Sequence, residues 1–312
     1  ADHIISPKGS ILMSIPFVHD FDAPYGQCQV ISPRIKRVLA NNPSPFSYTG
    51  TGSFILGTGP FAILDPGPND PDHIDALLNA LDDGICSAIL VTHTHLDHSP
   101  AAKPLADKLN VPIYAFGSHG MGNQRALEGE DVEAGADNDF APTHTIEDGE
   151  QLKFGDATLT AIHTPGHTSN HVCFHLEEEN TCFTGDHIMG WSTTIISPPD
   201  GDMADYMASL KKIRDLKPSL LRPIHGPAIE NPVPFIDALI EHRMVREETI
   251  YQAIVNGSDT IDTIVPKVYH DIDPNLYPAA ARSTLSHIIH LIDQNKVTTK
   301  DDIGLMASYM KA

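Results

Sequence analysis

The chain has 312 residues, enough for one large domain or two ordinary ones, and 41% of them are hydrophobic, enough to build a true core. This composition excludes intrinsic disorder and collagen-like structure. The 20 Lys and Arg residues against 41 Asp and Glu residues give a formal charge of −21, which argues against a protein that coats DNA or a membrane surface.

The first 50 residues are rich in turn formers and end in an Asn-Asn-Pro-Ser-Pro cluster at 41–45. Apolar spacing typical of a helix runs over 71–81, with Asp70 as N-cap and Pro71 at the first helical position. A continuous apolar run at 88–92 indicates a strand buried on both faces. The pattern predicts βαβ-like alternation, with two strands in 51–65, a helix over 71–81, a strand over 88–92, a helix over 101–109 and a strand over 111–116.

The middle of the chain changes character twice. Residues 120–145 are acidic and lack periodicity, which predicts a surface loop that borders a cleft. Residues 152–186 alternate like antiparallel strands, with a Glu-Glu-Glu-Asn turn at 177–180. A helix over 203–216 and a strand over 220–225 follow. We therefore expect an α/β (α+β) fold in which mixed sheets pack between helices.

The C-terminal part is predicted to be a separate, mainly helical unit. The texture of the sequence changes near Pro232 and Pro234, so we place one domain over 1–232 and a second over 233–312. Helical patterns over 235–255, 260–269 and 278–295 precede a polar tail. Three helices and a terminal hairpin indicate a small winged-helix-like unit.

The strongest chemical signal is the sequence Val-Thr-His-Thr-His-Leu-Asp-His at 91–98. His93 and His95 are two residues apart at the end of a buried strand, so both side chains leave the same side of an extended segment. Asp97 and His98 follow where the chain turns toward a helix. Four potential metal ligands within six residues make scattered surface histidines an improbable explanation, although motif matches of this kind do include false positives.

Three further candidate ligands stand at other strand ends. His167 follows a Pro-Gly turn, Asp186 follows a strand directly, and His225 stands at the end of the strand at 220–225. With the first cluster they supply five imidazoles and two carboxylates. Nitrogen and oxygen ligands without thiolates suit zinc, with manganese or iron as alternatives. Seven ligands are too many for one tetrahedral ion and about right for two ions that share a bridge.

These motifs in this order, HTHLDH, TPGHT, TGD and HGP, resemble the metallo-β-lactamase superfamily, whose members share an αβ/βα sandwich. Asp65 in FAILDPG is similar to the first motif of that superfamily. SPRIKRVLANNPSPF near the start and EHRMVREETI after HGPAIENP resemble the lactamase-β-like subgroup with a winged-helix tail. The resemblance covers nearly the whole chain and implies a fold and a type of centre, but no particular substrate.

Carried over residue by residue, the resemblance implies two ligand groups and a bridge. A first metal ion would be held by His93, His95 and His167. A second would be held by Asp97, His98 and His225, with Asp186 bridging the two. Asp97 is also the expected proton acceptor in catalysis. Candidates for orienting ligands or contacting substrate are Asp65, His171, His187 and Trp191.

The expected activity is a dinuclear zinc-dependent hydrolysis in which a metal-bridging hydroxide is the nucleophile. We prefer an activated acyl bond as substrate: a β-lactam, including as a promiscuous activity, or a lactone or thioester. The alternatives are a metal-dependent endoribonuclease that acts on single-stranded RNA and a non-catalytic binding module. The intact ligand set argues against the binding module.

The charge of the C-terminal part indicates which kind of partner the protein binds. Residues 235–312 carry seven Lys and Arg against eleven Asp and Glu, and the helix pattern at 278–295 has one Arg and one Asp, so nucleic acid is disfavoured. A cationic centre favours instead a small-molecule substrate with an anionic group. The sequence carries no signal of oligomeric state.

The expected compartment is the cytoplasm. The four cysteines, which form no CxxC pair, predict isolated buried thiols in a reducing environment. No stretch is apolar over the length that spans a bilayer, and no signal peptide is visible, so we expect no membrane association. The missing initiator Met also fits a leader that has been removed.

Overall fold

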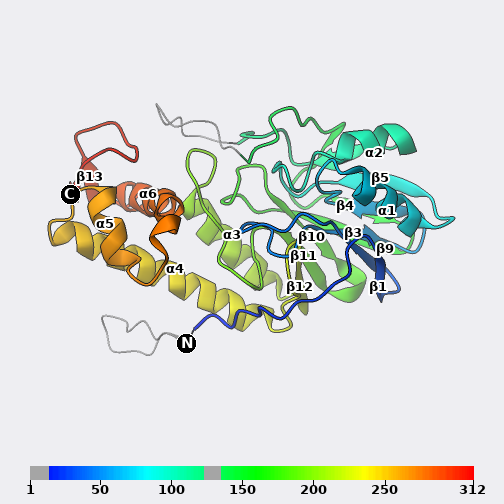
Figure 1. The fold of residues 1–312 in the computed structure, drawn as a ribbon, viewed down its shortest axis with the longest axis horizontal. Coiled ribbons are helices and arrows are strands. Elements are labelled where there is room, and N and C mark those ends of the chain that lie inside the picture. The colour runs from blue at the N-terminus through cyan, green and yellow to red at the C-terminus, as the bar shows by residue number, and fades with distance from the viewer. Residues whose placement is uncertain (1–13, 123–134) are drawn as a thin grey trace.

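The computed structural model describes residues 14–122 and 135–312, and Figure 1 shows its ribbon. Two β-sheets face each other, and helices cover their outer sides. The first sheet follows chain order, with antiparallel pairs up to β4 and parallel pairs from there to β7. Its strands are β1 (Cys28–Ser32), β2 (Ile35–Leu39), β3 (Gly52–Leu56), β4 (Phe61–Leu64), β5 (Cys86–Leu90), β6 (Ile113–Ala115) and β7 (His144–Thr145).

The second sheet has the order β12-β11-β10-β9-β8, and only its β11–β12 pair is parallel. The antiparallel strands and the turn predicted for 152–186 are confirmed, with a 3-10 turn, η1 (Glu177–Glu179), between β10 and β11. Its strands are β8 (Gln151–Phe154), β9 (Ala157–His163), β10 (Val172–Leu176), β11 (Thr181–Gly185) and β12 (Leu220–Pro223).

The main core lies between the two sheets. Phe54 of β3 meets Phe183 of β11 there, with ring centroids 4.9 Å apart. Every residue of β3 and β4 is buried, because helices cover the opposite face of the same strands. This double burial explains why residues 54–56 of β3 and the whole of β4 are continuously apolar instead of alternating.

Helices close the sandwich on both sides. α1 (Pro71–Leu81) and α2 (Ala102–Leu109) pack on the first sheet, and α3 (Met203–Leu216) with the start of α4 (Pro232–Val255) packs on the second. The predicted start of α1 is confirmed, since the side chain of Asp70 accepts a hydrogen bond from the amide of Asp72 (2.9 Å). The layers therefore run helix, sheet, sheet, helix.

The C-terminal unit has its own core. The end of α4 packs there with α5 (Ile261–Val268), α6 (Tyr277–Asp293) and the hairpin of β13 (Val297–Thr299) and β14 (Tyr309–Lys311). A 3-10 turn, η2 (Pro274–Leu276), precedes α6. The predicted helices and terminal hairpin are confirmed (Figure 1). Because α4 contributes to both cores, the boundary at 232/233 stays a prediction.

One hairpin was not predicted, and two expectations need correction. Residues 1–50 contain the hairpin of β1 and β2, which the sequence pattern missed because the short strands interrupt their apolar residues with polar ones. The predicted loop at 120–145 ends in β7, and part of it lies outside the described residues. All four cysteines are free, as expected, but Cys28 is exposed. In the part of the chain that the structure describes, we find no helix both long and apolar enough to cross a membrane.

Candidate metal centre

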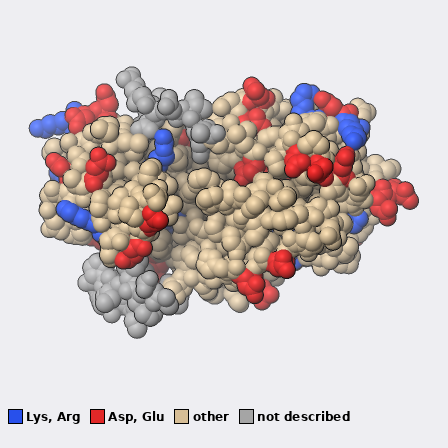
Figure 2. All heavy atoms as spheres, in the orientation of Figure 1, with Lys and Arg blue, Asp and Glu red and all other residues tan. Residues whose placement is uncertain are grey.

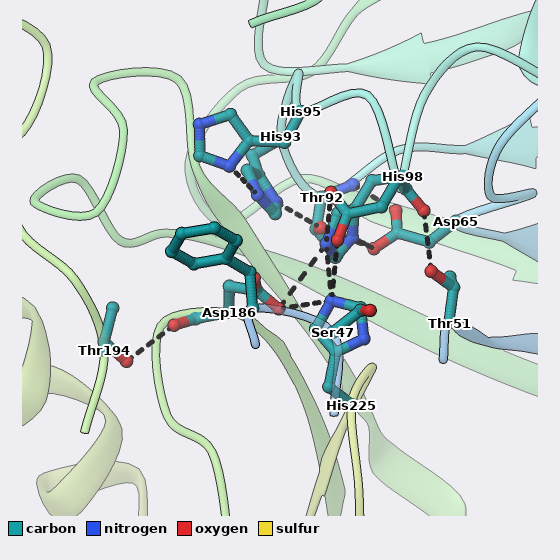
Figure 3. Close-up of polar contacts among 12 residues, drawn as sticks. Ser47, Thr51, Asp65, Thr92, His93, His95, His98, Asp186, Thr194 and His225 are labelled. Carbon is teal, nitrogen blue, oxygen red and sulfur yellow. Dashed lines mark hydrogen bonds and ion pairs between the residues drawn. The ribbon is translucent and has the colours of Figure 1, made fainter. Parts of the chain in front are cut away.

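The seven predicted ligands lie together at one edge of the sandwich, where strands of both sheets end. Figure 3 shows His93, His95, His98, Asp186 and His225 among them. His93, His95, Asp97 and His98 follow β5, and the other three follow β9, β11 and β12. The loop after β5 also joins the two sheets, because the carbonyl of Thr92 accepts a hydrogen bond from the amide of Val172 (2.8 Å). The sandwich thereby brings together side chains from four separate segments of the sequence.

Two glycines allow the turns that carry His167 and Asp186. Gly166 has a φ of +133°, and a Cβ there would lie 2.4 Å from the backbone of Tyr206. Gly185 has a φ of +51°, and a Cβ there would lie 2.4 Å from the His171 ring. Both positions therefore require glycine for conformation and for space.

The first predicted ligand group consists of three buried imidazoles. Nδ1 of His95 lies 2.9 Å from Nε2 of His93 and 3.2 Å from Nε2 of His167. One ligand atom from each of the three residues lies within 4.8 Å of the others, which is compact enough to surround one ion.

The second predicted group combines two imidazoles with a carboxylate. Nε2 of His225 lies 3.1 Å from Nε2 of His98 and 3.2 Å from Oδ2 of Asp97. Asp186 lies between the two groups. Its Oδ1 is 3.5 Å from Nε2 of His98 and its Oδ2 is 4.0 Å from Nε2 of His167. This is the position of a carboxylate that could bridge two ions.

Hydrogen bonds to the outer ring nitrogens fix the direction of four of these imidazoles. Nδ1 of His225 donates to the carbonyl of Gly50 (3.0 Å), and Nδ1 of His167 donates to that of Ile195 (2.7 Å). Nδ1 of His98 donates to the Asp65 carboxylate (2.8 Å).

His93 follows the same rule through a hydroxyl. The Thr92 hydroxyl donates to Asp65 (2.6 Å) and can therefore accept from Nδ1 of His93 (3.0 Å). With the outer nitrogens protonated, the inner Nε2 atoms turn their lone pairs toward one another. Lone pairs that face each other at these distances repel unless a cation lies among them, so the donor set fits metal ions.

The carboxylates of the centre are ionised at neutral pH. Burial tends to raise the pKa of Asp97, but the neighbouring His98 and His225 outweigh it and hold that pKa well below its usual range. The pKa of Asp186 is lowered in the same way against the effect of burial, first by His225 and then by His98. Two buried negative charges therefore face the imidazoles, which favours a cation.

The two imidazole groups differ in their affinity for protons. Burial lowers the pKa of His93 well below its ordinary value, and the neighbouring imidazoles of His98 and His95 lower it further. For His98, the carboxylates of Asp186 and Asp97 overcome the effect of burial and raise the pKa well above its ordinary value. The second group is thus the more negative environment.

Two of the proposed supporting residues contact ligands directly. Asp65 accepts hydrogen bonds from the amide of Thr92 (2.7 Å), from its hydroxyl and from His98, so both of its oxygens are engaged. Nε2 of His171 accepts a hydrogen bond from the amide of Asp186 (3.3 Å). Asp65 thereby orients one imidazole, and His171 steadies the turn of the central carboxylate.

The other two supporting candidates lie farther from the ligands. His187 is buried beside Tyr206, with ring centroids 5.0 Å apart, and burial lowers its pKa to about 3. Trp191 stacks on Tyr48 at 4.8 Å and lies against Gly226, the residue after His225. Their roles stay predictions.

Sequence reasoning missed the contacts that backbone carbonyls make. Gly50 and Ile195 orient His225 and His167 through their carbonyl oxygens. Every residue has a backbone carbonyl, so the residue type does not indicate this role. The hydroxyl of Thr194, which donates to the Asp186 carbonyl (2.7 Å), was also missed. A threonine eight residues after the predicted bridge carries no signal by itself.

Comparisons with known proteins agree with this arrangement. The family model described as the metallo-beta-lactamase superfamily matches residues 50–225, and that of the beta-lactamase associated winged helix domain matches residues 260–305. A beta-lactamase-like protein 2 homolog from Caenorhabditis elegans is 36% identical over 250 residues, which cover 77% of this chain and 78% of the relative. An atrochrysone carboxyl ACP thioesterase from Aspergillus fumigatus is 32% identical over 254 residues, covering 80% of this chain and 71% of the relative.

A solved structure shares the fold over nearly the full length. The crystal structure of a beta-lactamase domain protein from Burkholderia ambifaria matches with a TM-score of 0.77 and 20% identity, and the match covers 93% of this chain and 96% of that one. At this identity the likeness shows the fold alone. On the family models and the relatives, this chain belongs to the metallo-beta-lactamase superfamily, as a hydrolase with a C-terminal winged helix domain.

Proposed function

We propose that the centre holds two divalent cations, zinc in the simplest case, and hydrolyses an activated acyl bond in a small molecule. The observation that carries this proposal is the position of Asp186 between two complete ligand groups. One group alone would suit one ion, and a carboxylate within reach of both suits a pair.

The chain's own residues define what the site does around the cations. When bound, a pair of zinc ions would lower the pKa of a water molecule toward neutrality and polarise a substrate carbonyl. Asp97 is the most exposed of the seven predicted ligands, with 28% of its side chain accessible, so it faces the side from which water arrives. We propose that its carboxylate accepts the proton that is released when water attacks the carbonyl carbon of the substrate.

We place part of the substrate in a cavity of about 430 Å³ that none of the seven predicted ligands lines. It includes Ser169, two residues after His167, and α6 contributes to its other side. Asp200, Asp202 and Asp205 also line it. Carboxylates favour a neutral or cationic group in this cavity, so we place any anionic group of the substrate at the metal centre instead.

A thioester is the first acyl bond to test, because a relative at 32% identity is named an ACP thioesterase. Its hydrolysis would form a C–O bond, break the C–S bond and release an acid and a thiol. A β-lactam or a lactone has the same activated carbonyl. The acidic cavity disfavours RNA, and Lys and Arg of the C-terminal end are interspersed with Asp and Glu on the face shown in Figure 2.

The test combines metal analysis with three substrates. Zinc per chain is measured by mass spectrometry, and a simple acyl thioester, a chromogenic cephalosporin and single-stranded RNA are offered with and without a chelator. We expect two zinc ions per chain and chelator-sensitive turnover of the thioester or the cephalosporin. RNA cleavage with neither acyl substrate turned over would overturn the substrate class, and a chain that takes up no metal would overturn the proposal as a whole.

A further inference from the structure

Arg243 of α4 is a buried charge that packing alone does not explain. Only 4% of its surface is exposed, yet it forms no ion pair with a carboxylate of residues 14–122 or 135–312. Its Nη2 donates to the carbonyl of Thr194, and its Cζ lies 5.3 Å from the centre of the Tyr206 ring. A buried guanidinium without a carboxylate is costly, and an apolar side chain of similar length would pack there at lower cost.

The carbonyl that Arg243 binds belongs to a short segment that touches two predicted ligands. The Thr194 hydroxyl donates to the carbonyl of Asp186 (2.7 Å), as Figure 3 shows. It also lies 3.0 Å from the carbonyl of His187. The carbonyl of the next residue, Ile195, accepts the hydrogen bond from Nδ1 of His167 (2.7 Å). Two consecutive residues therefore contact one ligand of the first group and the backbone that carries the central carboxylate.

We propose that Arg243 is a positioning residue of the metal centre. By fixing the carbonyl of Thr194 it holds residues 194–195 in place, and these orient His167 and the turn of Asp186. The inference rests on the proposed function and deepens it, because it assigns to α4 a role at the ligands. The same helix continues into the C-terminal core through Ile250 and Ile254, so that unit is mechanically connected to the centre.

The physical reason is that the bond on the outer nitrogen sets the direction of an imidazole. If residues 194–195 shift, Nδ1 of His167 loses its acceptor, and neither its tautomer nor its ring orientation is fixed. Partners of this kind typically change metal affinity by about 10–100-fold when they are removed.

The chain provides a matched control on the same helix. Arg246 also donates to a backbone carbonyl, that of Val268 (2.7 Å), and its Cζ lies 4.1 Å from the centre of the Tyr269 ring. These contacts lie wholly within the C-terminal unit. Arg243→Met and Arg246→Met therefore remove the same chemistry from positions three residues apart on α4. The first side chain contacts Thr194 and Tyr206, and the second contacts Val268 and Tyr269.

The experiment compares full-length wild type, Arg243→Met and Arg246→Met with Thr194→Val, which keeps the carbonyl but removes the hydroxyl. Each metal-free protein is loaded with Co²⁺, and the visible absorption of the bound ions reports their coordination. Competition with a chromophoric chelator gives the zinc affinity, and urea unfolding of the metal-free proteins gives their stability.

We expect Arg243→Met and Thr194→Val to alter the Co²⁺ spectrum and to weaken zinc binding by about 10–100-fold. Arg243→Met should unfold at the same urea concentration as wild type or at a higher one. Arg246→Met should keep the wild-type spectrum and affinity.

A wild-type spectrum and affinity in Arg243→Met would overturn the inference, and so would an equal loss in Arg246→Met. If Arg243→Met fails to fold, Arg243→Lys, which keeps the charge but not the planar guanidinium, decides by the same two readouts. The outcomes also separate the two proposals. A wild-type chain that binds two ions while Arg243→Met does so equally well leaves the proposed function standing, whereas a wild-type chain that binds none removes both.

Discussion

Among the described residues, two clusters of buried and half-buried histidines and carboxylates have opposite properties because their geometry differs. At the strand ends, the imidazoles turn their inner nitrogens toward one another. Between α4 and α6, Nδ1 of His287 and Nδ1 of His290 both point at one oxygen of Glu247, at 3.3 and 2.7 Å. In the helical cluster the ring N–H groups therefore donate to a carboxylate of the protein itself.

The difference lies in what binds the second nitrogen of each ring. In the strand-end cluster, backbone carbonyls and Asp65 accept the ring protons from outside, which leaves lone pairs inside. In the helical cluster the carboxylate itself is the acceptor, so it forms a salt bridge and not a cation site. The number of histidines therefore says less about metal binding than the direction of their nitrogens.

Removing one ligand should have the largest effect and tests this comparison directly. We expect His95→Ala and Asp97→Ala each to lose at least one of the two metal ions and to reduce turnover to the level of the chelated wild type, because three-ligand groups become two-ligand groups. Metal content by mass spectrometry and turnover of the acyl substrate check this.

The matched control is His287→Ala, which removes an equally buried imidazole from the helical cluster. It should retain both ions. Unchanged metal content and turnover in His95→Ala, or a loss of metal in His287→Ala, would break the distinction between the two clusters.

Asp65→Asn should have an intermediate effect. The amide nitrogen cannot accept a hydrogen bond, so one of the donors, Nδ1 of His98 or the groups of Thr92, faces another donor. We expect zinc affinity to fall by about 10–100-fold with the ligands intact. Chelator competition measures this, and a wild-type affinity would show that Asp65 does not orient His98.

Glu247→Gln should have the smallest effect and should leave the metal untouched. It replaces the carboxylate that accepts from His287 and His290 with a neutral amide, whose oxygen still accepts but no longer pairs with a charged imidazole. We expect the free energy of unfolding to fall by about 1 kcal/mol near pH 5.5. Urea unfolding of the metal-free protein measures this, with zinc content as the control. A loss of zinc would mean that the two clusters are not independent.

The pH dependence of that effect has a defined sign. Burial tends to raise the pKa of Glu247, but His287 and His290 outweigh it and lower the pKa to about 2, so this contribution is complete above the unfolded value near 4.3 and is lost as the pH falls toward 2. The bond to Glu247 raises the pKa of His290 against the effect of burial, and Asp202 and Asp293 add to the rise.

The contribution of His290 is therefore complete below its unfolded pKa near 6.5 and is lost as the pH rises through the raised value. His287 is held neutral, because burial and the nearby Arg243 and Arg246 outweigh Glu247 and lower its pKa to about 4. The difference in stability between wild type and Glu247→Gln should be largest between about pH 4.3 and 6.5. A difference that does not change with pH would contradict this assignment.

Local sequence determined the parts of the centre that depend on backbone period and on turns. His93 and His95 share one side of the chain because alternate residues of an extended segment point the same way. Asp186 and His225 could be placed at strand ends because apolar runs stop just before them. The helical unit after 232 was also visible, since a 3.6-residue period is a local property.

Only the tertiary structure decided which of these segments meet. His98 and His225 are 127 residues apart and come within 3.1 Å because β12 pairs with β11 in the second sheet while β5 lies inside the first. The carbonyls that orient the rings and the contact of Arg243 with Thr194 arise in the same way. Such contacts depend on how two sheets and a helix pack together, and the local periodicity of the sequence does not predict that packing.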